Sequence, residues 1–165
     1  MTGHAIISPC GQFRYRLERD TSTCGGITAV IMVNPSTADA TQDDATIRKL
    51  KGFGVRNLWG RIVVGNLFAY RATDVRELGK CADPIGPSND DELARIALEA
   101  DRVVYAWGPV TKQPKALRNR WRAVDEIFRR LGHSPLCIGP VAKCGHPKHP
   151  LMLPYESQIS QWRFP

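Results

Sequence analysis

Three continuous apolar runs rich in β-branched residues recur along this chain, and they constrain its fold more than any other feature. The runs are ITAVIMV at 27–33, RIVVGNLFAY at 61–70 and RVVYAWG at 102–108. Uninterrupted runs of this kind are typical of strands that are covered on both faces, as in a parallel sheet. A shorter run, SPLCIG at 134–139, predicts a fourth such strand.

Helix-like segments separate these runs. Capping-box spacings predict helices that open near Thr41 and near Ser88. We expect the glycines Gly52 and Gly54 to break the first of these helices. An amphipathic stripe predicts a third helix over residues 115–131.

Strands that alternate with helices predict an α/β fold with right-handed crossovers. We expect a three-layer α/β/α sandwich around a central, mostly parallel, four-stranded sheet. Segment 13–20, FRYRLERD, alternates apolar and polar residues and can add an antiparallel strand at the N-terminal edge. The chain has 165 residues, which argues for a single domain over 1–165.

The charge balance favours a polyanionic partner. Lys and Arg number 23 against 16 Asp and Glu, and the formal net charge is +7, so nucleic acid is the first candidate. The five cysteines form no tight framework and predict free thiols in a reducing cytoplasm. The sequence shows no signal-peptide pattern and no membrane-spanning window, so we expect a cytoplasmic protein with no membrane partner.

Ligands of parallel α/β sheets bind at the carboxyl ends of the strands, so the segments after the apolar runs are the candidate site. The first run is followed by NPSTAD at 34–39. Pro35 restricts Asn34 to an extended backbone and thereby fixes where its amide points. Ser36 with Asp39 can cap a short turn whose N–H groups face an anion. A plain capped turn is the competing interpretation.

The second run ends at Asn66. An asparagine at the end of a buried strand carries two donors and one acceptor into a cleft, which suits the edge of a nucleobase. Phe68 or Tyr70 could stack on that base, and Arg71 could meet a phosphate. The alternative is that Asn66 ties down its own loop. After the third run, Gly108 permits another segment to approach the backbone closely.

Two histidines follow the last run, in CGHPKHPL at 144–151. Histidine titrates near neutrality and can donate a hydrogen bond to developing negative charge, and Lys148 between the two can bind a phosphate. The four side chains that a zinc site would use are Cys137, Cys144, His146 and His149. Their spacing fits no standard finger, and prolines restrict the loop, so we expect no metal and no other cofactor. A proline-rich surface loop with solvated histidines is the alternative.

The order of these motifs resembles the uracil-DNA glycosylase superfamily. MVNPS at 32–36 matches its first motif in the Asn-Pro form, and GNLFAYR at 65–71 matches its strand that ends in Asn. RVVYAWG at 102–108 matches its VIVALG-like strand, and HPKHPLML at 146–153 stands in the place of its H-P-x-x-x-L motif. The resemblance covers roughly residues 26–153.

The resemblance implies a role for each matching residue. Asn34 would position the attacking water or the sugar, and Asn66 would read the flipped base. His149, or alternatively His146, would stabilise the departing base anion. No carboxylate occupies the position of Asn34, so a true base would have to come from elsewhere. The carboxylates considered for that role are Asp39, Asp43 and Asp44.

The chain departs from the superfamily at Val33 and Ser36, where glycines are usual, and it lacks the iron–sulfur cysteine spacing of some members. A closer resemblance is to an uncharacterised bacterial family marked by L-N-P-S-T-A-D, N-L-F-A-Y-R-A-T-D and G-x-P-x-H-P-L. That family carries no assigned activity, so the functional expectation depends on the remoter resemblance.

We therefore expect a monomeric, DNA glycosylase-like repair hydrolase. It would flip a modified or mismatched base out of double- or single-stranded DNA and cleave its N-glycosidic bond. Asn34, His149 and Asp39 would be catalytic. The residues expected to bind substrate are Pro35, Ser36, Asn66, Phe68, Tyr70, Arg71, His146 and Lys148. Two alternatives remain, an enzyme that acts on free nucleotides or nucleosides and a non-catalytic nucleic-acid-binding module.

Overall fold

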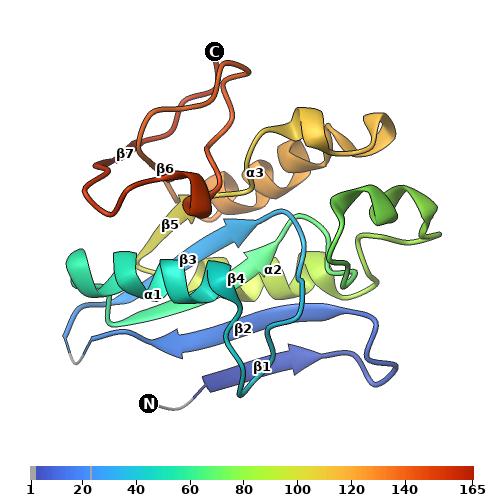
Figure 1. Cartoon of the computed structure of the whole chain (residues 1–165), viewed down its shortest axis with the longest axis horizontal. Coiled ribbons are helices and arrows are strands. Elements are labelled where there is room, and N and C mark those ends of the chain that lie inside the picture. Colours follow the sequence, from blue (N-terminus) through green and yellow to red (C-terminus); the bar gives the residue numbers. More distant parts are fainter. Residues whose placement is uncertain (1–2, 23) are drawn as a thin grey trace.

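The structure is a computed structural model and describes residues 3–22 and 24–165. Within these ranges, seven strands form one mixed sheet in the order β1-β2-β4-β3-β5-β6-β7 (Figure 1). Strands β1 to β7 span Gly3–Ile7, Arg14–Asp20, Ile27–Met32, Arg61–Asn66, Arg102–Tyr105, Leu136–Ile138 and Ile159–Gln161. Helices α1, α2 and α3 span Ala45–Arg56, Asn89–Glu99 and Arg120–Arg130. No helix in the described part of the chain is both long and apolar enough to cross a membrane.

Strands β4, β3, β5 and β6 form the parallel core of the sheet. The α/β fold with a parallel core of four strands, predicted from the apolar runs, is therefore confirmed. The antiparallel N-terminal strand predicted at 13–20 is confirmed as β2, which pairs antiparallel with β4. The outermost position belongs to a further strand, β1, which pairs antiparallel with β2 and was not predicted. Strand β7 pairs antiparallel with β6 at the opposite edge and was not predicted. A three-residue strand in a polar tail is too short to show periodicity.

Helices cover both faces of the sheet, with α1 on one face and α2 and α3 on the other (Figure 1). Successive residues of a strand point to opposite faces. Val30 of β3 accordingly packs in the same cluster as Leu50 of α1, whereas Ile31 packs with Leu93 of α2 and Phe128 of α3. The connections that leave β3 and β5 run to opposite faces. The boundary between these two adjacent strands is the switch point of the sheet. In doubly wound sheets, a ligand usually binds at the switch point.

Helix α1 begins at Ala45 rather than beside Thr41. Its N-cap is Asp44, whose carboxylate accepts a hydrogen bond from the backbone N–H of Ile47 at 2.9 Å. Thr41 instead belongs to a turn whose N–H groups are bound by the Asp39 carboxylate. The predicted capping box was wrong because Asp39 offers Thr41 a competing local partner.

The two glycines of α1 do not break the helix, contrary to the prediction. A Cβ atom on Gly52 would lie 2.5 Å from the ring of Tyr155, and one on Gly54 would lie 2.8 Å from the hydroxyl oxygen of Thr21. Glycine is used at both positions because another segment approaches the helix closely there. Helix propensity alone, which disfavours glycine by about 1 kcal/mol, gave the wrong expectation.

The other two helices depart from the prediction only at their starts. Ser88 is the N-cap residue of α2, but its side chain makes no capping hydrogen bond. Helix α3 begins at Arg120 because residues Lys115–Leu117 form a separate 3-10 turn.

A β-bulge in β2 changes which face its side chains occupy. The register against β1 shifts so that Tyr15 is an extra residue between Arg14 and Arg16. Arg16 reaches α2, whereas Arg14 lies on the α1 side with Leu17. Simple alternation would have placed both arginines on the same face.

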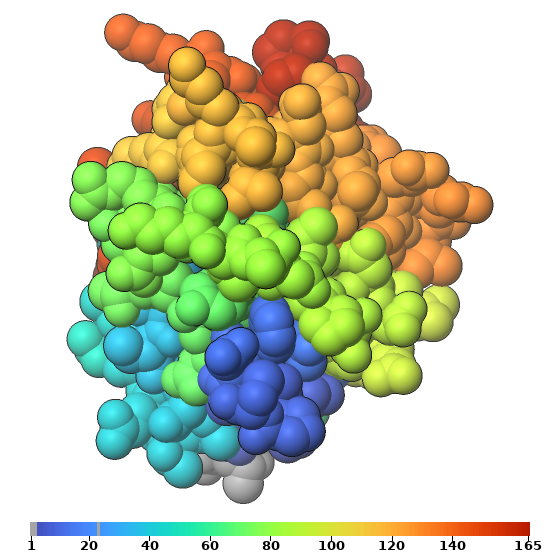
Figure 2. All heavy atoms as spheres, turned by 90° about the vertical axis from the view of Figure 1, so that its right-hand side faces the viewer, coloured from blue at the N-terminus to red at the C-terminus, as the bar shows by residue number. Residues whose placement is uncertain are grey.

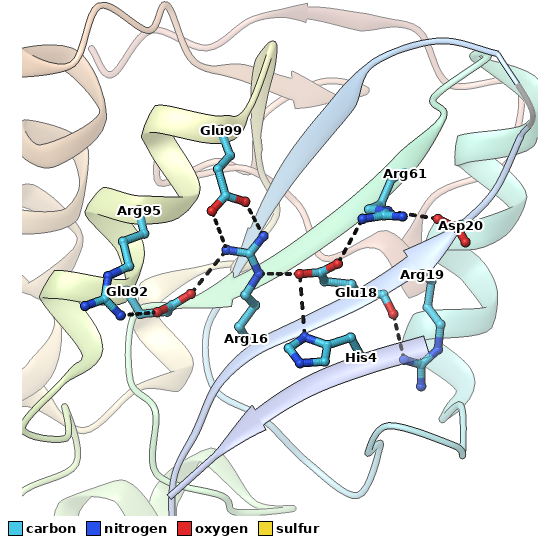
Figure 3. Close-up of polar contacts among 9 residues, drawn as sticks. All are labelled: His4, Arg16, Glu18, Arg19, Asp20, Arg61, Glu92, Arg95 and Glu99. Carbon is cyan, nitrogen blue, oxygen red and sulfur yellow. Dashed lines mark hydrogen bonds and ion pairs between the residues drawn. The ribbon is translucent and has the colours of Figure 1, made fainter. Parts of the chain in front are cut away.

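Arg16 joins β2 to α2 through a network of ion pairs (Figure 3). Its side chain is buried, and its guanidinium pairs with Glu18 at 2.6 Å, with Glu92 at 3.2 Å and with Glu99. Glu92 is itself buried and also pairs with Arg95 at 3.2 Å. Much of the basic charge in this part of the molecule is therefore neutralised internally.

We expect Arg16→Ala to lower the free energy of unfolding by about 3–5 kcal/mol, because it leaves the buried Glu92 without its buried partner. Arg61→Ala is the matched control. Its side chain is 46% exposed and pairs with Glu18 and Asp20, so the loss should be below about 1 kcal/mol. Urea denaturation of both variants measures the difference. Equal losses would contradict the assignment of Arg16 as the centre of the network.

Candidate functional site

A cavity of about 720 Å³ opens at the carboxyl ends of β3 and β4. The two strands supply Met32, Val64 and Asn66, and the first turn of α1 and segment 72–76 supply further walls. Figure 2 shows the side of the molecule on which these strands end, where the loop after β3 (cyan) lies beside the loop after β4 (green). The volume falls within the range typical of small-molecule sites, about 300–1,000 Å³.

Asn66, the last residue of β4, has the most unusual environment in this cavity. Its side chain is 1% exposed, and neither its Oδ1 nor its Nδ2 has a hydrogen-bond partner in the described part of the chain. Its backbone is well held, since Asn89 Nδ2 donates to the carbonyl of Asn66 at 3.1 Å. The strand end is thus fixed, while both amide atoms of this cavity-lining residue are left without a partner.

Asn34 follows β3 on the same edge of the sheet and also lines the cavity. Its Nδ2 donates to the carbonyl of Ala72 at 2.7 Å and to that of Pro35 at 3.1 Å. The buried Pro35 also accepts from the N–H of Ala72 at 3.0 Å, which joins the two loops. The amide orientation is therefore fixed mainly by Ala72, and no hydrogen bond to the Asn34 Oδ1 occurs among the described residues.

His149 closes the cavity from the loop after β6. Its Nδ1 accepts from the N–H of Leu151 at 3.3 Å, which places the proton of the neutral ring on Nε2. Burial and the charge of Lys112 lower the pKa of His149 below its ordinary value. Gly108 lies next to this histidine, but a Cβ atom on Gly108 would be in ordinary contact, 3.4 Å from the Cβ of His149. Its φ of 79° therefore favours glycine here, rather than the close approach that we expected. The site therefore holds a neutral imidazole that can donate a hydrogen bond.

Two carboxylates line the cavity, Asp44 and Asp74, whereas Asp39 does not. Hydrogen bonds from Arg76 lower the pKa of Asp74 to about 2, so Asp74 is a weak base. The Oδ1 of Asp39 accepts from the N–H and hydroxyl groups of Thr41 and from the N–H of Gln42. These hydrogen bonds lower the pKa of Asp39 and leave it a weak base. Asp43 is paired with Arg19 at 2.7 Å and with a lysine, so it serves a structural role.

Arg14 also lines the cavity, although nothing in the sequence marked it. The β-bulge at Tyr15 turns its side chain to this face, where it is 3% exposed. Its Nη1 donates to the carbonyl of Ala38, and its Nε has no partner in the described part of the chain. A buried guanidinium therefore lies beside the asparagines.

Three residues predicted to bind substrate after β4 do not line this cavity. Phe68 is fully buried on the α2 and α3 side of the sheet, so it cannot stack on a ligand here. Tyr70 and Arg71 line a neighbouring hollow of about 400 Å³. Ser36 lines both spaces, so the hollow adjoins the cavity.

The second histidine belongs to the core rather than to the cavity. His146 is 3% exposed and accepts a hydrogen bond from Trp107 Nε1 at 3.3 Å. The aromatic rings that surround it are Trp107, Trp121 and Phe164. Lys148 lies outside the cavity lining. Of the two histidines left open by the sequence, the structure brings only His149 to Asn34 and Asn66.

No group of three or more His, Cys, Asp or Glu side chains among residues 3–22 and 24–165 is placed to hold a metal ion. Of the four side chains that zinc would need, Cys137 is buried in β6 and His146 accepts its bond from Trp107. The cavity is instead lined by amides, one imidazole, two carboxylates and arginine side chains. This set suits hydrogen-bonding recognition of a polar organic ligand.

A family model described as "Protein of unknown function (DUF1643)" matches residues 14–151 of the chain. The matched segment includes all the cavity residues named above, from Arg14 to His149. This finding confirms the expectation of an uncharacterised family. No curated protein and no solved structure matches the chain.

Proposed function

We propose that this chain, which belongs to the DUF1643 family, is a DNA glycosylase-like hydrolase that releases a modified or mismatched base by cleaving its N-glycosidic bond. The observation that carries the proposal is the unpartnered amide of Asn66 in the cavity. A buried polar group without a hydrogen bond costs about 1–3 kcal/mol, so such a group is retained where a ligand completes it.

A nucleobase fits the hydrogen-bonding needs of Asn66. The amide presents an acceptor and a donor side by side, and base edges present the complementary pair. Hydrophobic contact with the base plane comes from Met32 and Val64, which line the same cavity. The cavity therefore offers both edge recognition and an apolar surface.

The chemistry of N-glycosidic cleavage assigns roles to the other residues. The sugar develops oxocarbenium character while negative charge grows on the departing base. His149 donates to that charge from Nε2, a preorganised hydrogen bond of the kind that stabilises transition states. Asn34 Oδ1 accepts a hydrogen bond from the attacking water, and Asp44 takes its proton.

The motif resemblance to uracil-DNA glycosylases agrees with this assignment. The three residues matched across distant motifs, Asn34, Asn66 and His149, line one cavity. Basic side chains for DNA phosphates are also available at its rim and in the adjoining spaces, namely Arg71, Arg76 and Lys112. Leu151 and Met152 are exposed next to His149 and offer apolar surface to an unstacked neighbouring base.

A screen of oligonucleotides with single altered bases, scored for abasic sites, tests the proposal. We expect release of at least one base by the wild type, and its loss in Asn34→Ala and His149→Ala. DNA binding should weaken steeply with salt, because phosphate contacts release counterions. Tight, base-selective binding without any base release would contradict the hydrolase proposal and would favour a non-catalytic binding module.

An enzyme that acts on free nucleotides is the second candidate. The buried guanidinium of Arg14 inside the cavity favours it, because this position suits a phosphate that enters together with its base. Hydrolysis of nucleotides but not of oligonucleotides, with no salt-dependent DNA binding, would select this candidate.

We expect Asp44→Asn to reduce base release by about 100- to 10,000-fold, because it removes the general base. Asparagine is as good an N-cap as aspartate, so α1 and the stability of the fold should persist. Asp39→Asn is the matched control and should leave base release unchanged. Single-turnover rates of both variants give the comparison, and normal activity in Asp44→Asn would remove this residue from the mechanism.

A further inference from the structure

Arg14 is a buried cation without a contacting counterion. Its side chain is 3% exposed, and no salt bridge from it to a carboxylate occurs among the described residues. Its Nη1 donates to the carbonyl of Ala38, while its Nε remains unpartnered. Buried charges are normally paired, so the absence of a partner within the fold points to one that arrives with a ligand.

The charged groups around Arg14 do not replace this partner. Asp44 and Asp39 act on it only at a distance, and their effect is opposed by Arg71 and Arg19. The Oδ1 of Asp39 is occupied by a turn, and the Oδ1 of Asp44 by the N–H of Ile47. Burial lowers the pKa of Arg14 to about 10, so the guanidinium remains charged at neutral pH.

The first turn of α1 faces the same cavity. Ala45 and Thr46 both line it, and the N–H groups of the first helical turn have no partner within the helix. The partial positive charge at a helix N-terminus adds to this preference for an anion. Two independent features, a buried cation and a helix start, therefore converge on one cavity.

We infer that Arg14 and the first turn of α1 form a phosphate-binding subsite in the cavity that contains Asn66. The inference rests on the proposed function and narrows its substrate to a nucleotide whose phosphate is bound inside the cavity. Guanidinium groups recognise phosphate through paired hydrogen bonds, and the free Nε provides one of them. The phosphate comes either from a free nucleoside monophosphate or from a phosphodiester beside a base in a strand.

Heteronuclear NMR of the wild-type protein tests the subsite directly. We expect inorganic phosphate to shift the Arg14 Nε–H resonance and the backbone N–H resonances of Ala45 and Thr46. Sodium chloride at equal ionic strength should not do so. The inference would be overturned if these three resonances stayed unchanged, or if chloride moved them equally.

Binding of 2′-deoxynucleosides and their 5′-monophosphates provides the second measurement. We expect the wild type to bind the monophosphate at least about 10-fold more tightly than the nucleoside. Arg14→Gln should abolish this preference, and Arg14→Lys should retain part of it. Arg95→Gln removes an equal charge from α2, where the side chain is 70% exposed. This control should leave the preference for the monophosphate unchanged. If Arg14→Gln does not fold, the binding preference of Arg14→Lys and the NMR titration of the wild type decide whether the subsite binds phosphate.

Two further comparisons are needed. The first distinguishes a phosphodiester from a free nucleotide as the source of the phosphate, and the second distinguishes failure of the subsite from failure of the glycosylase proposal. Tighter binding of oligonucleotides than of monophosphates identifies a phosphodiester, and the reverse identifies a free nucleotide. Phosphate-induced shifts without base release from any substrate would retain the subsite and refute the glycosylase proposal. Base release that is indifferent to Arg14→Lys and Arg14→Gln, with no phosphate shifts, would retain the glycosylase and refute the subsite.

Discussion

Asn66→Leu is expected to abolish base release and, at the same time, to stabilise the protein. Leucine has a similar size but needs no hydrogen bonds, so it removes the penalty of the unpartnered amide. We expect the free energy of unfolding to rise by about 1–3 kcal/mol. Base release should fall by about 100-fold or more, because the group that we propose recognises the base is lost.

Asn89→Leu is the matched control for this experiment. Asn89 is also fully buried and its Oδ1 is likewise unpartnered, but its Nδ2 donates to the carbonyls of Asn66 and Leu67. Its replacement should therefore lower the free energy of unfolding by about 1–3 kcal/mol. Denaturant unfolding and single-turnover base release, measured on both variants, give the comparison. A loss of stability in Asn66→Leu equal to that in Asn89→Leu would show that the Asn66 amide is structural.

His149→Ala is expected to reduce base release by about 100- to 1,000-fold, the usual effect of removing one preorganised donor to developing negative charge. Ground-state binding of substrate should change much less, since the hydrogen bond strengthens only as the base departs. His4→Ala, at an exposed position on β1, is the control and should leave the rate unchanged. A rate equal to the wild type in His149→Ala would refute its role.

The same histidine predicts a dependence of stability on pH. The folded pKa of His149 is lowered from 6.5 by burial and by Lys112, so the unfolded chain binds a proton first as the pH falls. Stability from this group is therefore fully present above pH 6.5 and declines as the pH falls below it. The decline should be smaller in His149→Ala, as measured by denaturant unfolding at pH 7.5 and 5.5. Burial also lowers the pKa of His146, so this histidine contributes a similar loss of stability at low pH to the wild type and to His149→Ala.

The parallel core could be predicted because burial on both faces is written into the local sequence. The runs at 27–33, 61–70 and 102–108 contain few polar side chains, and such runs fit only covered strands. Because parallel strands end on the same edge, the sequence also predicted that Asn34 and Asn66 lie close together. Both line the cavity in the structure.

Arg14 could not be predicted as a cavity residue, and Asp44 could not be singled out from Asp39 and Asp43, because both outcomes depend on contacts that the local pattern does not contain. Arg14 reaches the cavity only through the bulge at Tyr15, which is fixed by the register against β1. Thr41 donates its N–H to Asp39, so Asp44 rather than Thr41 is the N-cap of α1, and Asp44 lines the cavity. Local patterns contain no information on either competition.

The sequence by itself determined the order of the core strands β3 to β6 and of the helices between them, and with it the edge of the sheet at which the cavity opens. Only the tertiary structure decided that His149 faces that edge while His146 is enclosed by Trp107, Trp121 and Phe164. The physical reason is that a continuous apolar run, which marks a strand covered on both faces, is a local property of the sequence. The partner of each polar side chain depends on which remote segment packs beside it.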